Sequence, residues 1–557
     1  MIPVRAVTAM LMASLLAAPA SAQEVAPTMA GRSTVYAPNG VIATSQPLAT
    51  AAGLAVLQKG GNAVDAAVTA AAVLNLVEPH MTGIGGDLFA MLWSAREQRL
   101  VGLNASGRSG SRMTLAAFAG RGLDAIPLFG AEPITVPGAL SGWAALLDRY
   151  GTITLAKALA PAIRLAEEGF PVSPIIAGQW AVEVDRLKGD AGARATFLVD
   201  GARAPRAGEW FKNPGLAASY RLIADSGPGV FYGGSLGRRI VDHLSGMGGF
   251  LTLDDLARHE AVWVEPISTR FRGHTVWELP PNGQGVAALE MLRILESYDL
   301  KAMGHNSAAY LHHLIEAKKL AFADLARWVG DPDAMTASPE RLLSDEFIRA
   351  RRAALDSRRA TPRAEPGAAA TSSETIYLAA ADADGNMVSF INSIYWEFGS
   401  GVVVPGTGFA LQNRGAGFSL TPRRPNTLAP RKRPFHTIIP AFVTKPGPAG
   451  EEPWLAFGVM GGSIQPQGHV QVLVNLLEFG MELQEAIDAP RFRHYDGVRV
   501  GLEAPIPEAV RRALAAMGHE IVALPPADAG GAQAVMRLVR GWAAGSDPRK
   551  DGMAAGW

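Results

Sequence analysis

The sequence of 557 residues contains no cysteine, and this absence limits both its architecture and its chemistry. Without cysteine there is no disulfide framework, no thiol nucleophile and no cysteine-based metal site. Any covalent catalysis must therefore use a serine, a threonine, a lysine or a carboxylate. The 11 histidines are scattered, and His312 and His313 are adjacent, so in a helix they point to different faces. The sequence therefore predicts no metal centre.

The chain also has no excess of one charge, because 51 Lys and Arg residues balance 51 Asp and Glu residues. A neutral chain gives no indication of a nucleic-acid-binding surface, and we expect no nucleic-acid partner. Long hydrophobic runs are absent after the N-terminal segment, so the sequence predicts no transmembrane helix there.

The N-terminal segment has the pattern of a secretory signal peptide. Met1 to Ala22 carries an early cation at Arg5, an apolar run from Val7 to Ala18, and a final Ala20-Ser21-Ala22. An uncleaved membrane anchor is the alternative, but the apolar run is short for a bilayer of ordinary thickness. We therefore expect export to the periplasm or the medium, with residues 1–22 removed.

A change of composition near residue 375 is the main break in the chain. Residues 351–374 are rich in Arg, Ala, Pro and Ser and poor in large hydrophobic side chains, which predicts a flexible, exposed connector. Residues 375–381 and 387–394 are then typical of two strands, joined by a turn at Asp382-Ala383-Asp384-Gly385-Asn386. Thr375 thus stands at the boundary between a connector and a buried hairpin.

Two local patterns are suited to acyl-transfer chemistry. A backbone cut before Thr375 would place a free α-amine beside its hydroxyl, and an amine with an ordinary pKa near 8 can accept the hydroxyl proton. Gly461-Gly462 lie between a strand expected at 454–460 and a helix expected at 470–479, so their N–H groups can point at an oxyanion. Taken alone, each pattern is better explained by an ordinary strand start or glycine turn.

Several longer motifs together resemble the γ-glutamyltransferase family of N-terminal-nucleophile hydrolases. The run after Thr375 contains D-x-D-G-N and continues to F-G-S-G, as the start of the small subunit does in that family. Further matches follow in family order: LQKGGNAVDAAVTAAAV (57–73), GIGGD (83–87), PPNGQGVAALEML (280–292), RKRPFHTIIP (431–440), GVMGGSIQPQ (458–467) and SDPRKDGMAAG (546–556). The resemblance therefore spans nearly the whole chain after the signal peptide.

This resemblance implies an α+β fold, the four-layer αββα sandwich, made as a precursor that cuts itself between Glu374 and Thr375. The large subunit would be residues 23–374 and the small subunit residues 375–557, and the two would be interleaved in one structural unit. The partners implied are a small-molecule acyl-amide substrate and the two subunits themselves. No metal or organic cofactor is implied.

The resemblance also implies roles for individual residues. Thr375 would be the nucleophile and, once cut free, its own base. Gly461 and Gly462 would form the oxyanion hole. Positions near the substrate would be Ser393, Tyr395, His436 and Thr437.

The sequence departs from the family where the amino-acid part of the substrate is bound. Typical members hold the α-carboxylate with an arginine, whose position is Ala105 here. They bind the α-amine with an acidic pair, which is replaced here near Ala416-Gly417. Arg108 and Arg414 are the candidates for a different carboxylate contact, because arginine binds carboxylates through two parallel hydrogen bonds.

Two substrate classes stay open for this reason. One is the γ-glutamyl amides, such as glutathione, which the family favours. The other is glutaryl-type amides that lack an α-amine, because a buried α-ammonium without an anion beside it is strongly unfavourable. Either water or an amine is a possible acyl acceptor.

Two other functions fit parts of the sequence. Gly233-Gly234-Ser235-Leu236-Gly237 matches G-x-S-x-G of serine hydrolases, in an apparent strand-then-helix context, but no HGGG-type oxyanion motif accompanies it. A periplasmic solute-binding protein would share the signal peptide, the length and the neutral charge. It would not explain a connector placed just before Thr375, so both alternatives are disfavoured.

Overall fold

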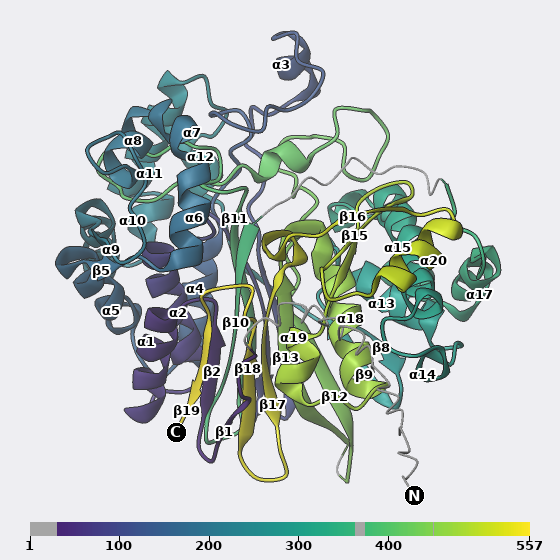
Figure 1. The fold of residues 1–557 in the computed structure, drawn as a ribbon. Helices are drawn as coiled ribbons and strands as arrows, with labels where there is room; N and C mark the ends of the chain where they lie inside the picture. The colour runs from purple at the N-terminus through teal and green to yellow at the C-terminus, as the bar shows by residue number, and fades with distance from the viewer. Residues whose placement is uncertain (1–30, 363–373, 449) are drawn as a thin grey trace, which may run out of the picture.

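The computed structural model describes residues 31–362, 374–448 and 450–557. The predicted signal peptide and residues 363–373 of the predicted connector lie outside these ranges. Two seven-stranded sheets form the centre of the described chain (Figure 1). Within these ranges, no helix is both long enough and apolar enough to cross a membrane.

The first sheet is built mostly from the C-terminal part of the chain. Its strands are antiparallel, in the order β1 (Val35–Ala37), β18 (Trp542–Ser546), β17 (Gly531–Arg537), β13 (Gly450–Met460), β12 (Ala441–Gly447), β9 (His274–Glu278) and β8 (Ile267–Phe271).

The second sheet combines strands from both sides of the predicted cut. Its order is β19 (Met553–Gly556), β2 (Val41–Thr44), β10 (Glu374–Ala381), β11 (Met387–Tyr395), β3 (Asp87–Ser94), β4 (Arg99–Ala105) and β7 (Val262–Val264). The hairpin predicted after Thr375 is therefore present as β10 and β11, and it is inserted between two strands of the N-terminal part.

Three apolar clusters define four layers. One cluster joins the two sheets face to face, with Tyr377 and Phe89 from the second sheet and Phe442 from the first. A second cluster joins the other face of the second sheet to helices such as α2 (Ala63–Val77). A third joins the other face of the first sheet to helices such as α13 (Gly285–Leu295). The predicted αββα sandwich is therefore confirmed (Figure 1).

The helices form two groups, one on each side of the stacked sheets (Figure 1). The group beside the second sheet contains α1 (Pro47–Gln58), α2, α4 (Ala139–Tyr150), α5 (Leu155–Glu168), α6 (Pro174–Val182), α7 (Val184–Lys188), α8 (Ala191–Phe197), α9 (Pro214–Ser226), α10 (Gly229–Tyr232), α11 (Ser235–Gly246) and α12 (Leu253–Ala257). The group beside the first sheet contains α13, α14 (Leu300–Met303), α15 (Ala308–Trp328), α16 (Pro339–Leu342), α17 (Asp345–Ala354), α18 (Gln465–Leu477), α19 (Leu483–Asp488) and α20 (Glu508–Ala516).

Smaller elements complete the fold. Helix α3 (Leu115–Ala119) projects at the top of Figure 1. A three-stranded sheet consists of β14 (Phe492–His494), β15 (Arg499–Leu502) and β16 (Glu520–Ala523). A two-stranded ribbon pairs β5 (Phe170–Pro171) with β6 (Trp210–Phe211), and four 3₁₀ turns are η1 (Pro332–Ala334), η2 (Arg414–Gly417), η3 (Gly462–Ile464) and η4 (Pro526–Ala529).

The predicted connector begins later than the sequence indicates. Helix α17 continues to Ala354, and the segment after it is fixed by buried side chains of α15. His312 Nε2 contacts the Asp356 carbonyl at 2.8 Å, and Lys319 Nζ donates to the Thr361 carbonyl at 3.0 Å. Residues 351–354 are therefore helical, and residues 355–362 contact a remote helix although most of them are exposed. Composition alone does not reveal such contacts.

Candidate active site

Thr375 is fully buried near the start of β10, directly after Glu374 in that strand. The pairing of β10 with β11 changes register between Glu374 and Ile376, so Thr375 lies at a β-bulge. Such irregularities re-aim a side chain relative to a regular ladder. The Thr375 hydroxyl donates to Ser393 Oγ at 3.1 Å.

Ser393 Oγ is shared by three hydrogen-bond donors. Besides the Thr375 hydroxyl, it accepts from the backbone N–H of Tyr395 at 2.9 Å and from Arg414 Nη2 at 3.1 Å. Tyr395 has a positive φ of 79°, which is uncommon for a residue with a large side chain. This turn at the end of β11 brings the Tyr395 ring under the Arg414 guanidinium. The Arg414 Cζ lies 4.2 Å from the centre of the ring.

Arg414 is a buried cation that no carboxylate neutralises at close range. It is 1% exposed, and its Nη1 donates to Thr437 Oγ1 at 2.7 Å. Among the described residues no carboxylate oxygen lies within 4.0 Å of it, and its Nε has no hydrogen-bond partner. Burial lowers the pKa of Arg414 to about 10, an effect that the charge of Asp87 opposes. The group therefore stays positive at neutral pH and is suited to binding an anion.

His436, next to Thr437, forms a buried pair with Asp87. His436 Nε2 lies 2.9 Å from Asp87 Oδ2, and the other carboxylate oxygen accepts from the backbone N–H of Gly107 at 2.8 Å. Burial, and then the charge of Arg414, lower the pKa of His436 to about 4. The imidazole is therefore neutral at pH 7, and its Nδ1 is a buried acceptor without a hydrogen-bond partner.

The two glycines lie where the sequence predicts, between β13 and α18. Gly461 and Gly462 have φ values of 121° and 67°, which side chains other than glycine rarely adopt. We call Gly461-Gly462 the glycine corner. Gln284 links this corner to Thr437. Its Nε2 donates to the Gly462 carbonyl at 2.9 Å and to the Thr437 carbonyl at 2.5 Å.

Contacts therefore connect Thr375, Ser393, Arg414, Thr437 and the glycine corner in one buried network. Gln284 of this network, and Asp87 beside it on His436, were missed by the sequence analysis. Both stand inside motifs noted there, GIGGD and PPNGQGV. A polar side chain within a glycine-rich motif was the available signal.

Arg108 lies outside this network. Its Nη1 contacts Asp331 Oδ2 at 3.3 Å and the Arg431 carbonyl at 3.0 Å, and its side chain is 39% exposed. It lines a separate cavity of about 220 Å³ together with His259 and Arg433. The two arginine candidates are thus in different surroundings, and only Arg414 contacts the Thr375 network.

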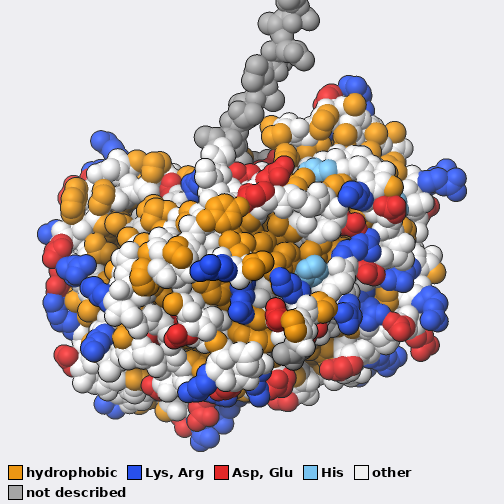
Figure 2. Space-filling view, turned by 90° about the horizontal axis from the view of Figure 1, so that it is seen from below, with side chains coloured by type: hydrophobic (Ala, Val, Ile, Leu, Met, Phe, Trp, Pro, Cys, Tyr) orange, Lys and Arg blue, Asp and Glu red, His pale blue; other side chains and the backbone are white. Residues whose placement is uncertain are grey.

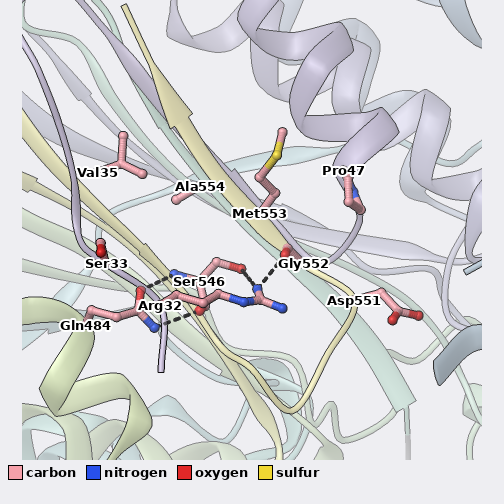
Figure 3. Close-up of a pocket in the computed structure, with 10 residues that line it drawn as sticks. All are labelled: Arg32, Ser33, Val35, Pro47, Gln484, Ser546, Asp551, Gly552, Met553 and Ala554. Carbon is pink, nitrogen blue, oxygen red and sulfur yellow. Dashed lines mark hydrogen bonds between the residues drawn. The ribbon is translucent and has the colours of Figure 1, made fainter. Parts of the chain in front are cut away.

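Other features are separate from Thr375. A cavity of about 360 Å³ lies near the N-terminal segment, where Arg32 Nη1 contacts Ser546 Oγ at 3.3 Å (Figure 3). Ser235 of the G-x-S-x-G match is exposed at the start of α11, and the segment before it is the helix α10 rather than a strand. The face in Figure 2 carries both signs of charge intermixed.

One buried group of side chains has the composition of a metal site, which the sequence analysis did not predict. His312, Glu316 and His519 each offer a ligand atom, and these atoms lie within 4.8 Å of one another. His312 Nδ1 already contacts His519 Nε2 at 2.8 Å, and Lys319 Nζ lies 2.7 Å from Glu316 Oε1. The Lys319 ammonium thus takes the place of a cation beside Glu316.

The sequence and the fold are similar to those of known proteins. The family model described as Gamma-glutamyltranspeptidase matches residues 49–557. The glutathione hydrolase-like YwrD proenzyme of Bacillus subtilis is 39% identical, over 91% of this chain and 97% of the relative. The oxamate amidohydrolase proenzyme of Klebsiella pneumoniae is 36% identical, over 93% of this chain and 98% of the relative. The crystal structure of a cephalosporin acylase from Bacillus halodurans is similar with a TM-score of 0.89 and 45% identity, covering 98% of this chain and 99% of that one.

Proposed function

Because the chain belongs to the gamma-glutamyltranspeptidase family of hydrolases and transferases, we propose that it is an amidohydrolase with Thr375 as an N-terminal nucleophile. Its substrate is an amide whose acyl group carries a free carboxylate, bound by Arg414. The observation that supports this proposal is the buried, un-neutralised guanidinium two hydrogen bonds away from the Thr375 hydroxyl.

Maturation comes first. The Thr375 hydroxyl attacks the carbonyl carbon of Glu374, and the peptide bond is exchanged for an ester with release of the Thr375 amine. Water then hydrolyses the ester and leaves a carboxylate on Glu374. The new α-amine has an ordinary pKa near 8, so it serves as the base for its own hydroxyl.

Turnover repeats the same chemistry on a substrate. The amine takes the hydroxyl proton while Oγ1 attacks the amide carbonyl, and the backbone N–H groups of Gly461 and Gly462 stabilise the negative oxygen. The proton passes to the leaving amine as the C–N bond breaks, and Thr375 retains the acyl group as an ester. Water or a second amine then takes the acyl group and restores the hydroxyl.

The spacing of the site limits how a carboxylate-bearing acyl group can lie between Thr375 and Arg414. Thr375 Oγ1 and Arg414 Nη2 contact the same Ser393 oxygen, so they lie no more than about 6 Å apart. The two carboxyl carbons of an extended five-carbon diacid are about 5 Å apart. An ester bond of about 1.4 Å and a carboxylate–guanidinium contact of about 2.8 Å add to this length, so a glutaryl group on Thr375 reaches Arg414 only if it bends alongside Ser393.

A γ-glutamyl group has the same length, and its α-ammonium is what separates the two substrate classes. The ammonium would lie close to the Arg414 cation, and the nearby carboxylate of Asp87 already holds His436 at 2.9 Å. This arrangement favours glutaryl-type amides. The γ-glutamyl reaction remains the second candidate, because the unpartnered Nδ1 of His436 can accept one hydrogen bond from an amine.

A matched pair of substrates tests the proposal. We expect the processed enzyme to hydrolyse glutaryl nitroanilide at least about tenfold better in kcat/KM than γ-glutamyl nitroanilide, since an uncompensated buried charge is costly. A preference of that size for the γ-glutamyl compound would establish the second candidate instead. Hydrolysis of either compound by the Thr375→Ala variant would refute the assignment of Thr375 as the nucleophile.

A further inference from the structure

Arg493 is a second buried cation without a carboxylate partner, and it lies beside the glycine corner. It belongs to β14 and is 3% exposed. Its Nη2 contacts Ser463 Oγ at 3.4 Å, and its Nη1 donates to the Asp528 carbonyl at 3.0 Å. No carboxylate oxygen of the described residues lies within 4.0 Å of the guanidinium, and Nε has no hydrogen-bond partner.

Neighbouring arginines show that pairing is available in this region. Arg491, two residues earlier, lies 2.7 Å from Asp547, and Arg549 lies 2.6 Å from Glu503. A buried charge without a partner is strongly unfavourable, and paired charges are the rule in protein interiors. An unpaired Arg493 is therefore better explained by a charge that develops during the reaction than by stability.

The contacts of Arg493 join the two segments that shape the corner. Ser463 directly follows Gly462, and Asp528 stands two residues before Gly530. Gly530 packs closely on the corner, because a Cβ atom added to Gly461 would lie 3.2 Å from the Gly530 Cα. One guanidinium thus ties η3 and η4 together directly behind the predicted oxyanion hole.

We infer that Arg493 is a positioning residue for this oxyanion hole. Its two Nη groups hold Ser463 and the Asp528 carbonyl so that the N–H groups of Gly461 and Gly462 stay aimed at the substrate carbonyl. Its charge stabilises the negative oxygen that forms when Thr375 attacks. The inference rests on the proposed function, since it requires Thr375 to be the nucleophile.

The field of Arg493 reaches other groups in this part of the molecule. Burial is the main cause that lowers the pKa of Lys318 to about 7, and the charge of Arg493 is the next. A charge that acts on a neighbouring amine in a buried region also acts on an oxyanion formed at the corner.

The test compares Arg493→Met and Arg493→Lys with wild type on processed enzyme. Arg499→Met is the matched control, because Arg499 is exposed and its guanidinium lies over the same Tyr495 ring, at 5.1 Å against 5.2 Å for Arg493. The substrates are glutaryl nitroanilides with and without a carboxylate on the ring. We expect Arg493→Met to lower kcat about 10- to 100-fold on both, with KM within about threefold.

The lysine variant keeps the positive charge but loses the planar guanidinium that binds two partners at once. Its loss of kcat should therefore be smaller than that of Arg493→Met. Arg499→Met should stay within about twofold of wild type. An unchanged kcat in Arg493→Met would overturn the inference. A loss confined to KM of the ring-carboxylate substrate would also overturn it, and would make Arg493 a binding group for the amine half.

Two precautions keep the result interpretable. If Arg493→Met does not fold, as judged by its thermal unfolding, Ser463→Ala removes one contact while the charge stays, and a fall in kcat is still expected. If wild type cleaves neither anilide, the proposed function fails. If wild type cleaves both and Arg493→Met matches it, only the inference about Arg493 fails.

Discussion

At Arg414, substrate binding and the stability of the free protein make opposite demands. Its guanidinium is fully enclosed, yet within the described part of the chain its hydrogen bonds go to two hydroxyl groups, those of Ser393 and Thr437, and to no carboxylate. Hydroxyl groups compensate a buried charge less well than an anion does. The missing anion is what a carboxylate-bearing acyl group supplies, so binding energy and catalytic placement come from the same contact.

We predict that Arg414→Met lowers kcat/KM for glutaryl nitroanilide about 100-fold or more. Losing the partner of a buried carboxylate costs on the order of 3 kcal/mol, and each 1.4 kcal/mol is about tenfold. Arg108→Met is the control, because Arg108 is partly exposed and contacts Asp331 instead of the Thr375 network. Steady-state kinetics on both processed variants make the comparison. Equal losses in the two variants, or a loss only in Arg108→Met, would contradict the assignment.

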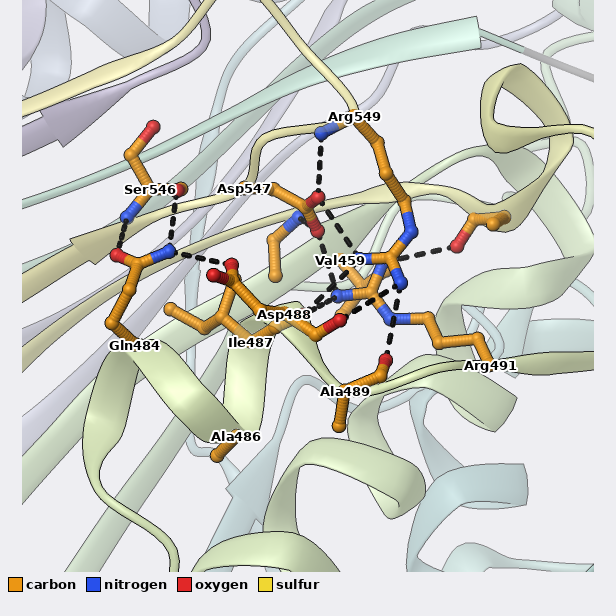
Figure 4. A network of polar contacts seen from close by, with 12 residues as sticks. Val459, Gln484, Ala486, Ile487, Asp488, Ala489, Arg491, Ser546, Asp547 and Arg549 are labelled. Atoms are coloured by element: carbon orange, nitrogen blue, oxygen red, sulfur yellow. Dashed lines mark hydrogen bonds and ion pairs between the residues drawn. The ribbon is translucent and has the colours of Figure 1, made fainter. Parts of the chain in front are cut away.

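At the scale of elements, the glycine corner depends on a buried network of charges. Arg491 and Arg549 both contact Asp547 (Figure 4). Arg549 also contacts Glu503. Arg491 Nη1 reaches the Ala529 carbonyl at 3.0 Å, and the Ala532 N–H donates to Asp547 Oδ2 at 2.8 Å. The network therefore holds the loop that carries Gly530 against the end of β13.

Replacing Asp547 by asparagine should destabilise the protein by about 3–5 kcal/mol, because two buried arginines then lose their shared anion. Equilibrium unfolding in denaturant measures this loss. Asp254→Asn is a suitable control, since Asp254 forms exposed ion pairs with Arg258 and Arg431. Exposed pairs contribute at most about 1 kcal/mol. Similar losses for the two variants would show that the buried network does not support the fold.

Helix α15 carries two residues, His312 and Glu316, of the buried group that also includes His519. Because of this group, the stability of the protein should depend on pH. Burial lowers the pKa of His519 to about 3 in the folded protein, against an ordinary value of about 6.5. Between these values the unfolded chain binds the proton first. The contribution of a neutral His519 to stability is therefore present above pH 6.5 and is lost as the pH falls toward 3.

We therefore predict that wild type loses thermal stability more steeply than His519→Gln as the pH falls from 7 to 5. Glutamine does not titrate and keeps a donor for His312 Nδ1, so the difference between the two curves reports the titration of His519 together with its effect on His312. Melting temperatures recorded across this range test the prediction. Curves that run parallel would show that His519 does not titrate in the way proposed.

Elements with a strong local signal were predictable from the sequence. The β10–β11 hairpin follows from its turn residues and apolar strands, and β13 followed by α18 follows from the glycines between them. The sequence suggests a strand at Gly229–Tyr232, but the segment is helical. Four residues carry too little periodicity for a sequence pattern to distinguish a helix from a strand. Residues 351–362 are fixed by α15, and no local pattern indicates a contact so remote in sequence.

In the candidate site, too, residues within local motifs were predictable, and contacts between remote residues were not. Motifs pointed to Thr375, Ser393 and the two glycines as candidates, but the choice between Arg108 and Arg414 was left open. Only the fold shows that Arg414 reaches Ser393 while Arg108 reaches Asp331. Asp87 and Gln284 act through partners about 350 and 150 residues away, so spacing along the chain could not reveal their roles.

For the whole molecule, the sandwich makes the two predicted subunits inseparable without unfolding. Strand β10 after its first residue, Glu374, and all of β11 follow the predicted cut but pair with β2 and β3, which precede it. The first sheet likewise joins β9 to β12 across the cut. Cutting the peptide bond therefore leaves both sheets and their shared core in place.

We predict that the purified protein shows two bands on a denaturing gel and one particle by size-exclusion chromatography. Removal of residues 1–22 and cleavage before Thr375 give chains of roughly 37 and 19 kDa, as lengths of residues 23–374 and 375–557 imply. Thr375→Ala should remain a single chain of roughly 56 kDa, while Thr375→Ser keeps a hydroxyl and should still be cut, more slowly. Because the strands of the two chains alternate in one sheet, separation should require denaturant. Wild type that stays uncut yet hydrolyses the anilide would show that a free α-amine on Thr375 is not the base.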